Sequence, residues 1–292
     1  MSAANASVWA VVLTAGGEEV TAACIESLLA QDYAPLTVLL VDNDSQDGSG
    51  KRLEARYPRI RYLNTGSNCG YAGGNNRGIA LALGNGADHL MVINNDTIAE
   101  PGCVAALVRT AREGSNVGAV SPKILYFDDP GLIWYGGGTL SRSRAIGIHD
   151  DENQRDAQGA TRARSITFAT GCCVLLPAAV ARSSGGFAED FFMYCEDVDL
   201  SLRLSRSGYT MYYQPEARVL HRKPVQGDAP SPFQIRLRDR NRRRMVRRHY
   251  SLGDRLAFAG WFYPTRAVRC VMYLARGDWP RARAILAGVT EA

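Results

Sequence analysis

The stretch DHLMVINNDT, residues 88–97, indicates both a fold class and the position of a ligand site. It begins as an apolar run, which is typical of a strand buried on both faces of a sheet. The run then ends abruptly in two amides and a carboxylate, Asn94, Asn95 and Asp96. In open α/β sheets, ligands bind beyond the carboxyl ends of the strands. The stretch therefore predicts a buried strand with a ligand site at its end.

Further apolar runs with the same continuous pattern are separated by segments with helical spacing, which predicts a βαβ series. The expected strands are 9–14, 36–42, 60–64 and 89–94, and the expected helices between them are 19–31, 50–57 and 76–83. Two later strands, 168–176 and 209–214, should bracket a helix that begins near Glu196. Residues 125–165 are rich in Gly, Asp and Ser and predict a long excursion over one edge of the sheet. The fold class is therefore α/β, with a mostly parallel sheet flanked by helices.

The polar residues that follow the strands define one expected crevice. It contains Thr14 after the first strand, Asp42 after the second, Asn68 with Gly70, Gly73 and Gly74 after the third, and Asp96 after the fourth. A Rossmann dinucleotide site requires G-x-G-x-x-G directly after the first strand. This chain has AGGEE there, at 15–19, and its glycine-rich loop comes after the third strand. The pattern argues against an NAD enzyme.

The composition is that of a folded protein without a membrane span. The 292 residues are 46% hydrophobic, and no apolar run approaches the roughly 20 residues that cross a bilayer. The N-terminus has no basic region of the kind that begins a secretory signal. The seven cysteines form no C-x-x-C pair, and the adjacent Cys172 and Cys173 are interpreted as small buried apolar residues. These features predict a protein of the reducing cytoplasm.

Seven blocks of sequence follow one another in the chain: VVLTAGGEEVTAACIESLLAQDY (11–33), VDNDSQDGS (41–49), NCGYAGGNNRGIALA (68–82), INNDT (93–97), ATGCCVLLP (169–177), GGFAEDFFMYCEDVDLSLRLSRSGY (185–209) and PEARVLH (215–221). Together they resemble family 2 of the inverting glycosyltransferases, close to its rhamnosyltransferase-like branch. The resemblance covers about residues 8–250. It implies a GT-A fold, a dTDP- or UDP-sugar donor, Mn²⁺ or Mg²⁺, and inversion at the anomeric carbon. An alternative is a nucleotide-sugar-binding protein without catalysis, which a donor-hydrolysis assay would distinguish.

The resemblance assigns the donor side of the crevice. Asp96 matches the carboxylate that holds the cation against the donor diphosphate, and Asn95 matches a position that bonds a ribose hydroxyl. Asp42 matches the acceptor of the N3 hydrogen of uracil or thymine. Relatives usually carry an aromatic residue, which helps to hold the nucleotide base, where this chain has Ala15. Thr14 is expected to contact the nucleotide through its backbone. The simpler interpretation of Asp96 is a strand-ending turn in which its carboxylate caps a following helix.

The glycine-rich loop has two interpretations. Gly70, Gly73 and Gly74 would let the backbone approach a ligand, and Asn75, expected just ahead of the helix, would present its amide to phosphate or ribose. The alternative is a flexible loop.

The resemblance also assigns the catalytic side. Asp197 matches the base that deprotonates the acceptor hydroxyl, and Glu196 is expected to position the acceptor. Both would lie in the first turn of a helix, where the helix dipole alone favours carboxylates. His221 matches a position that in some relatives supplies a second metal ligand, although a lone histidine is also a common structural residue.

The positive charge is concentrated late in the chain, where residues 228–270 hold eleven arginines and three aspartates. We expect residues 1–228 to form the catalytic domain and residues 229–292 a basic helical extension. The run RLRDRNRRRMVRR (236–248) lacks the interleaved aromatics of nucleic-acid-binding surfaces. With Phe258, Trp261, Phe262 and Tyr263 it is expected to rest on the inner face of the plasma membrane and present the active site to a lipid-linked acceptor. A solvated or dimer-forming face is the alternative. The oligomeric state stays open.

Overall fold

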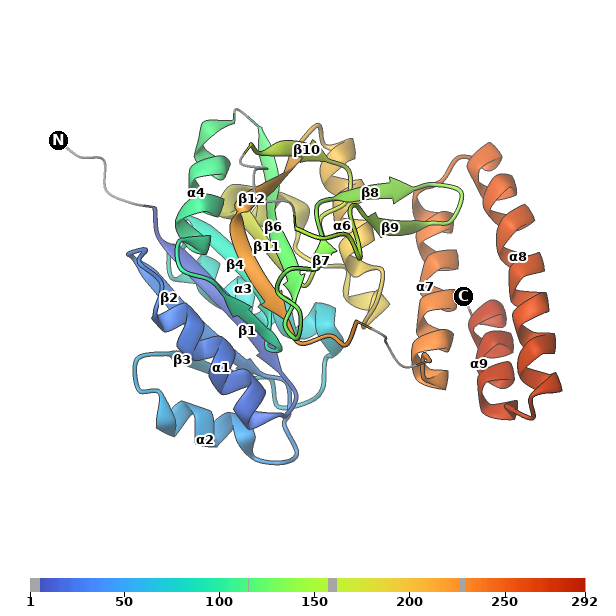
Figure 1. Cartoon of the computed structure of the whole chain (residues 1–292), viewed down its shortest axis with the longest axis horizontal. Coiled ribbons are helices and arrows are strands. Elements are labelled where there is room, and N and C mark those ends of the chain that lie inside the picture. The colour runs from blue at the N-terminus through green and yellow to red at the C-terminus, as the bar shows by residue number, and fades with distance from the viewer. Residues whose placement is uncertain (1–5, 115, 157–161, 226–228, 292) are drawn as a thin grey trace.

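The computed structural model describes residues 6–114, 116–156, 162–225 and 229–291. Within these residues the chain forms a mixed ten-stranded sheet with helices on both faces, and a group of C-terminal helices stands at one side (Figure 1). The strands are β1 (Val8–Thr14), β2 (Leu36–Asp42), β3 (Arg61–Asn64), β4 (His89–Asn94), β5 (Thr97–Ala99), β6 (Val117–Tyr126), β7 (Ile133–Tyr135), β8 (Gly138–Ser141), β9 (Ile146–His149), β10 (Arg164–Ile166), β11 (Cys173–Pro177) and β12 (Thr210–His221). The helices are α1 (Glu18–Leu29), α2 (Ser49–Arg56), α3 (Gly70–Gly84), α4 (Cys103–Glu113), α5 (Ala178–Ser184), α6 (Glu196–Arg206), α7 (Pro232–His249), α8 (Leu252–Ala275) and α9 (Trp279–Thr290).

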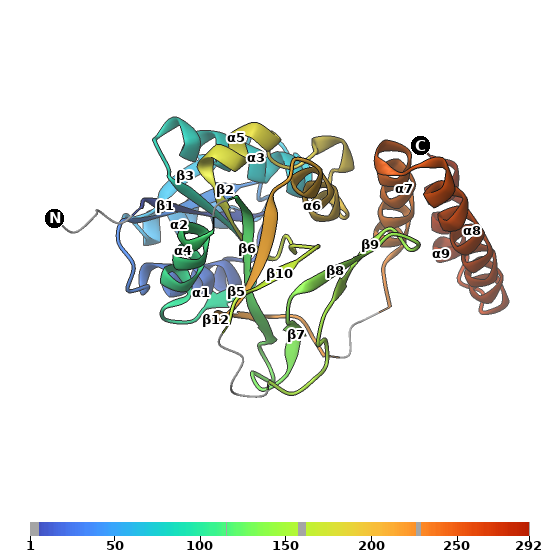
Figure 2. The same ribbon diagram turned by 90° about the horizontal axis from the view of Figure 1, so that it is seen from above.

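The sheet has the order β10-β12-β6-β11-β4-β1-β2-β3. Strands β3, β2, β1 and β4 are parallel neighbours, as are β6 and β12, whereas β11 runs antiparallel between β4 and β6. The prediction of a mostly parallel sheet is confirmed. Helix α3 covers one face and helices α1 and α4 the other (Figure 2). Because both faces are covered, the central strands are buried along nearly their whole length, as their continuous apolar sequences predict.

Three sequence expectations differ from the structure. The segment 168–176 is a strand only from Cys173, because residues 171–172 form a turn that leads into it. The third strand is an edge strand whose ends are exposed, rather than one buried on both faces. The strand expected at 209–214 continues to His221 as one strand, β12, whose register shifts between Gln214 and Arg218. Pro215, which has no backbone N–H to donate, lies within this irregularity.

The antiparallel strands determine where the site lies. Because β11 reverses direction, the turn before it lies beside the end of β4, and the Asn94 backbone N–H donates to the Cys172 carbonyl at 2.9 Å. Strand β5 pairs with the end of β12, with Thr97 opposite His221. Cys172 and Cys173 are both buried, as predicted. The sheet thus collects the ends of β1, β4 and β12 and the start of β11 at one edge.

The excursion between β6 and β11 contains strand β7, the β8–β9 hairpin and β10. Helices α7, α8 and α9 follow the sheet, as expected from Pro232 onward, and Asp239 on α7 accepts a hydrogen bond from Arg266 on α8 at 2.7 Å. The expected domain boundary at residue 228 lies outside the described residues. In the described part of the chain, no helix has the length and apolar character needed to cross a membrane.

Candidate active site

A cleft of about 600 Å³ opens at the edge of the sheet where these strand ends meet. It is lined by residues from the ends of β1, β4 and β12, from the turn before β11, from the excursion, and from the start of α6. Of the residues predicted from the sequence, the cleft collects Thr14, Asn68, Asn95, Asp96, Glu196, Asp197 and His221. Segments separated by some 200 residues of sequence therefore share one cavity.

Asp96 lies in the tight turn between β4 and β5. No helix follows it directly, since α4 begins at Cys103 behind Gly102, so the helix-capping interpretation of Asp96 is wrong. One carboxylate oxygen, Oδ2, lies 3.3 Å from Nε2 of His221. The other oxygen, Oδ1, and Nδ1 of His221 are buried without a hydrogen-bond partner in the described structure. Unsatisfied buried polar atoms are costly unless a ligand completes them.

The Asp96 and His221 pair fits a divalent cation that is shared with a phosphorylated ligand. Within the described residues there is no cluster of three or more His, Cys, Asp or Glu side chains suited to a metal ion. Mg²⁺ sites of enzymes that act on phosphates typically use one or two protein carboxylates and complete the coordination with water and phosphate oxygens. The Asp96 carboxylate and the His221 imidazole would supply two ligands to such an ion. A phosphorylated ligand and water would have to supply the remaining ones.

The second acidic pair, Glu196 and Asp197, begins α6. Asp197 accepts hydrogen bonds from the backbone N–H of Gly171 at 3.1 Å and of Val198 at 2.8 Å. Burial raises the pKa of Asp197, and burial followed by the charge of Asp197 raises the pKa of Glu196 to about 8. Near neutral pH Glu196 therefore holds its proton, and the two backbone N–H groups favour the charged form of Asp197. The Glu196 Oε2 atom is buried without a partner in the described structure.

The backbone before this pair is strained. Phe192, Tyr194 and Cys195 all have positive φ angles, of 63°, 71° and 70°. Such conformations are uncommon for residues other than glycine, asparagine and aspartate, and they persist only where the surroundings enforce them. The side-chain amide of Asn241 on α7 enforces them here: it contacts the carbonyls of Phe191, Met193 and Tyr194 at 2.9, 2.8 and 2.8 Å. The C-terminal helices thereby fix the loop that carries the acidic pair.

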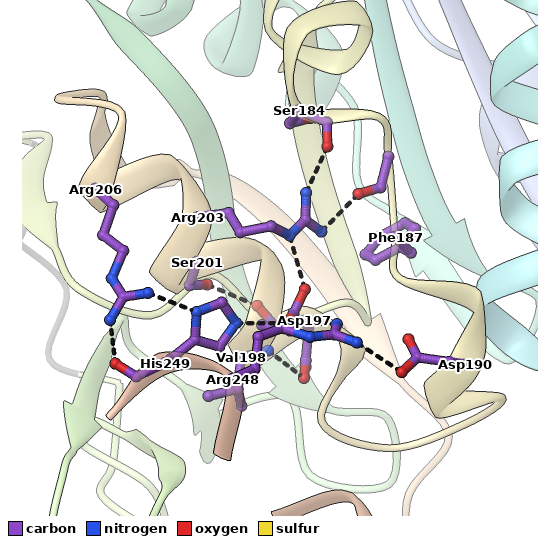
Figure 3. Close-up of polar contacts among 12 residues, drawn as sticks. Ser184, Phe187, Asp190, Asp197, Val198, Ser201, Arg203, Arg206, Arg248 and His249 are labelled. Carbon is purple, nitrogen blue, oxygen red and sulfur yellow. Dashed lines mark hydrogen bonds and ion pairs between the residues drawn. The ribbon is translucent and has the colours of Figure 1, made fainter. Parts of the chain in front are cut away.

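The first turn of α6 is also anchored by Asp199, which is fully buried. Figure 3 shows Arg203, Arg248 and His249 directed toward this part of α6. Asp199 pairs with Arg203 at 2.7 Å, with Arg248 at 3.2 Å and with His249 at 2.6 Å. Burial alone would raise the pKa of Asp199, but the hydrogen bonds from His249 and Arg203 outweigh it and lower the pKa. Two of these partners come from α7, so a second group of contacts joins the extension to the helix that carries the acidic pair.

On the donor side, the predicted residues form a hydrogen-bonded group. The amide of Asn95 donates to the hydroxyl of Thr21 at 2.9 Å and approaches that of Thr14 at 3.4 Å. Asp42 is buried outside the lining of the cleft and accepts from Ser45 N–H, the Tyr62 hydroxyl and the Asn64 amide. Burial alone would raise the pKa of Asp42, but these hydrogen bonds outweigh it and lower the pKa. Asp42 is therefore a carboxylate at neutral pH.

The structure corrects the expectation for the glycine-rich loop. Helix α3 begins at Gly70, not at residue 76, so Gly73, Gly74 and Asn75 lie inside it. A Cβ on Gly74 would lie 2.4 Å from Leu13, and one on Gly70, whose φ is +70°, would lie 2.4 Å from the Phe192 carbonyl. These glycines bring α3 close to β1 and to the strained loop. Asn75 is fully buried and donates to the Tyr71 carbonyl at 3.0 Å, which removes it from the residues that can contact a ligand.

Several residues of the cleft were not predicted. Trp134, His149 and Glu152 come from the excursion, and Lys223 follows β12. The Trp134 ring meets His221 edge-on, with centroids 4.5 Å apart. Asn43 organises the loop before α3 by bonding Asn68 and the Gly70 carbonyl, both at 3.1 Å. Of these residues, only Asn43 could have been predicted from the sequence. It follows Asp42 at the end of a strand, and Asn95 follows a strand in the same way.

Comparison with known proteins identifies the fold and the family. Over 219 residues the chain is 33% identical to the N-acetylglucosaminyl-diphospho-decaprenol L-rhamnosyltransferase of Mycobacterium tuberculosis, covering 68% of this chain and 70% of that protein. It is 29% identical over 226 residues to the galactofuranosyltransferase GlfT1 of the same organism, covering 74% and 70%. The crystal structure of GalNAc-T7 with UDP, GalNAc and Mn²⁺ superposes with a TM-score of 0.63 at 12% identity, over 83% of this chain and 47% of that one, which supports the GT-A fold. The profile of Glycosyl transferase family 2 matches residues 9–184. The chain belongs to that family and is a glycosyltransferase.

Proposed function

We propose that this glycosyltransferase moves a sugar, with inversion, from a dTDP- or UDP-sugar to a hydroxyl of a lipid-linked saccharide during cell-envelope polysaccharide synthesis. The observation that carries the proposal is that Asp96 with His221 and Glu196 with Asp197 line one cleft. The first pair suits the leaving group and the second suits the acceptor. A protein that only binds nucleotide sugars has no need of the second pair.

Asp96 and His221 would hold the Mn²⁺ or Mg²⁺ ion, which when bound stabilises the charge that develops on the departing diphosphate. Lys223 lies in the same cleft and adds a cation on that side. Asp42 makes three hydrogen bonds and can accept a further one, which suits the N3 hydrogen of uracil or thymine. Thr14, Asn68 and Asn95 would complete the contacts to the nucleoside.

Asp197 is the base. Its carboxylate takes the proton of the acceptor hydroxyl while the acceptor oxygen forms a bond to the anomeric carbon. The bond between that carbon and the diphosphate oxygen breaks on the opposite face, and its electron pair leaves with the nucleoside diphosphate. Neutral Glu196, whose Oε2 has no partner in the described structure, donates a hydrogen bond that orients the acceptor. Its protonation also keeps a second negative charge away from the incoming sugar.

The surface that would meet a membrane differs from the one expected from the sequence. Phe258 and Phe262 are buried, and Arg242 and Arg243 on α7 are buried against backbone carbonyls. The outer face of α8 instead exposes a row of apolar side chains: Leu252, Leu256, Tyr263, Val268, Val271, Met272 and Leu274. The four charged residues of α8 lie outside this row, and an apolar helical face of this kind, close to arginines, suits an anionic membrane surface.

The sugar and acceptor are tested together. The chain should be incubated with Mn²⁺, a panel of dTDP- and UDP-sugars, and an N-acetylglucosaminyl-diphospho-polyprenol acceptor of the kind that the rhamnosyltransferase relative is named for. We expect transfer from one donor, and NMR of the product should show an inverted anomeric configuration. Donor binding without transfer or hydrolysis would favour the non-catalytic alternative, and a product of retained configuration would contradict the assignment of Asp197.

A further inference from the structure

A second cavity, of about 450 Å³, adjoins the donor cleft. The two cavities share Tyr194, Glu196, Asp197 and Arg238, so the acidic pair lies between them. The rest of the second cavity is formed by α7, α8 and the start of β9. If the donor occupies the first cavity, a molecule in the second cavity meets Asp197 from another side. The position suits the acceptor.

The second cavity is rich in arginine. Arg238 and Arg242 come from α7, and Arg266 and Arg269 come from α8. We call this space the arginine cavity. Among the described residues, and apart from the acidic pair at its junction with the cleft, Asp239 is the one carboxylate that lines it. Asp239 is already paired with Arg266 at 2.7 Å. The lining therefore carries an excess of positive charge.

Arg242 illustrates how this charge is held. It is only 6% exposed, and its guanidinium donates to the Arg144 carbonyl and lies over the rings of Trp261 and Phe262. None of the described carboxylates forms an ion pair with it. Burial, and then the charge of Arg266, lower the pKa of Arg242 to about 10. A buried guanidinium without a counter-ion is costly to the protein, and a bound anion would offset that cost.

Arg238 and Arg269 are the exposed members of the group. Arg238 lies over the Tyr194 ring, 4.7 Å from its centroid, in the strained loop that precedes the acidic pair. Arg269 donates to the Tyr273 hydroxyl at 3.5 Å, a long contact that a stronger acceptor would replace. Guanidinium groups bind phosphate oxygens in pairs of parallel hydrogen bonds, and several of them around one cavity suit a ligand with more than one phosphate.

We propose that the arginine cavity binds the diphosphate of the lipid-linked acceptor and thereby places the acceptor sugar beside Asp197. This rests on the proposed function, because it takes the acceptor to be a sugar joined to a lipid through a diphosphate. The diphosphate of the donor belongs to the other cavity, where Asp96 and His221 lie. One enzyme thus has two diphosphate sites: one uses a cation and the other uses arginines.

Binding is tested first, in a protein whose donor site is disabled. Calorimetry with inorganic pyrophosphate and EDTA should show binding to Asp96→Ala, and Arg269→Ala in that background should weaken it by about tenfold or more, the usual effect of losing a charged hydrogen bond. Arg276→Ala, at an exposed arginine that directly follows α8 and lies outside the cavity, is the control and should bind as its parent does. No binding to Asp96→Ala, or equal loss in Arg276→Ala, overturns the proposal.

Kinetic assays then test whether the arginine cavity binds the diphosphate of the acceptor rather than some other phosphate. With an N-acetylglucosaminyl-diphospho-lipid acceptor, Arg269→Ala should raise the acceptor KM about tenfold and leave the donor KM unchanged. With an uncharged alkyl N-acetylglucosaminide the same variant should match wild type. Equal effects on both acceptors would contradict the proposal. Should the wild-type protein use neither acceptor, the proposed function fails on its own, and the pyrophosphate experiment still decides whether the arginine cavity binds diphosphate.

Discussion

Among single residues, the most informative feature is that two adjacent carboxyl groups have different surroundings. Asp197 is held by two backbone N–H groups, which favour its charged form, whereas Glu196 Oε2 has no partner in the described structure. The environment thus distinguishes a base from an acid in neighbouring positions. Three predictions follow from this arrangement and from Asp96.

Asp197→Asn should lower turnover by roughly 10²- to 10⁴-fold, because the amide keeps the size of the side chain but cannot accept the proton. Donor affinity should change little, because Asp197 does not hold the donor. The melting temperature should fall, since Gly171 and Val198 donate to different carboxylate oxygens and the single amide oxygen can keep only one of these bonds. Steady-state kinetics with saturating donor measure the first effect and calorimetry the second. A folded variant within a few fold of wild-type turnover would transfer the role of base to Glu196.

Asp96→Ala should abolish the part of nucleoside diphosphate binding that depends on Mn²⁺, because the cation loses its carboxylate. Calorimetry with UDP or dTDP, with and without Mn²⁺, measures that difference. Asp88→Ala is a matched control, because Asp88 lies next to the opposite end of the same strand and bonds Ser7. If Mn²⁺ still enhances binding to Asp96→Ala, the cation lies elsewhere.

Glu196→Gln should change how stability depends on pH. A carboxyl whose pKa is raised on folding stabilises the protein fully below its unfolded pKa, and this contribution is lost as pH rises through the folded value of about 8. Wild type should therefore lose stability between pH 5 and pH 9, and the variant, which cannot ionise there, should lose less. One pKa unit corresponds to about 1.4 kcal/mol, so the difference should exceed about 1 kcal/mol in urea unfolding. Parallel curves for the two proteins would show that Glu196 is not held neutral.

At the scale of secondary-structure elements, helix α7 supports the catalytic loop. Asn241 holds three carbonyls of the strained segment, and Arg248 and His249 hold Asp199 in α6. The acidic pair can occupy its position only while these contacts persist, because the positive φ angles before it are unfavourable in an isolated loop.

Asn241→Asp should therefore lower turnover by about tenfold to a hundredfold, since a carboxylate cannot donate to the carbonyls and would move the loop. The donor KM should stay near wild type, because none of the described hydrogen bonds or ion pairs joins Asp96 or His221 to α7. Arg247→Ala, an exposed residue of the same helix, is the control. Equal losses in both variants, or a change in donor KM alone, would argue against a positioning role for Asn241.

The sequence predicts these elements unequally. Strands β1, β2 and β4 and the start of helix α6 are predicted within one or two residues, because long apolar runs and helical spacing depend on local pattern alone. The start of α3 was missed because glycines usually end helices, and only the closeness of Leu13 and Phe192 explains why they lie in one here. Asp96 and Asp197 could be proposed from motifs. The supporting Asn241 could not, because its partners are backbone carbonyls some 50 residues away in sequence.

In the whole protein, helix α8 of the C-terminal extension carries cavity-lining residues on one side and exposed apolar residues on the other. The inner side of this helix carries Arg266, which lines the arginine cavity, and its outer side carries the apolar row. A diphosphate-linked lipid has its diphosphate at the membrane surface and its chain within the bilayer. A helix with arginines on one side and apolar residues on the other suits that boundary.

The outer face of α8 should therefore bind vesicles of anionic phospholipid. Val271, which is 65% exposed, lies within the apolar row, and Val271→Asp should remove its apolar contact and repel the anionic surface. We expect a severalfold loss of vesicle-bound protein in sedimentation at low salt, with unchanged transfer to a water-soluble acceptor. Val225→Asp, an exposed valine outside α8, is the control and should sediment as wild type does. If wild type ignores anionic vesicles but is a dimer by light scattering, and Val271→Asp is a monomer, then the row joins two copies of the chain instead of meeting a membrane.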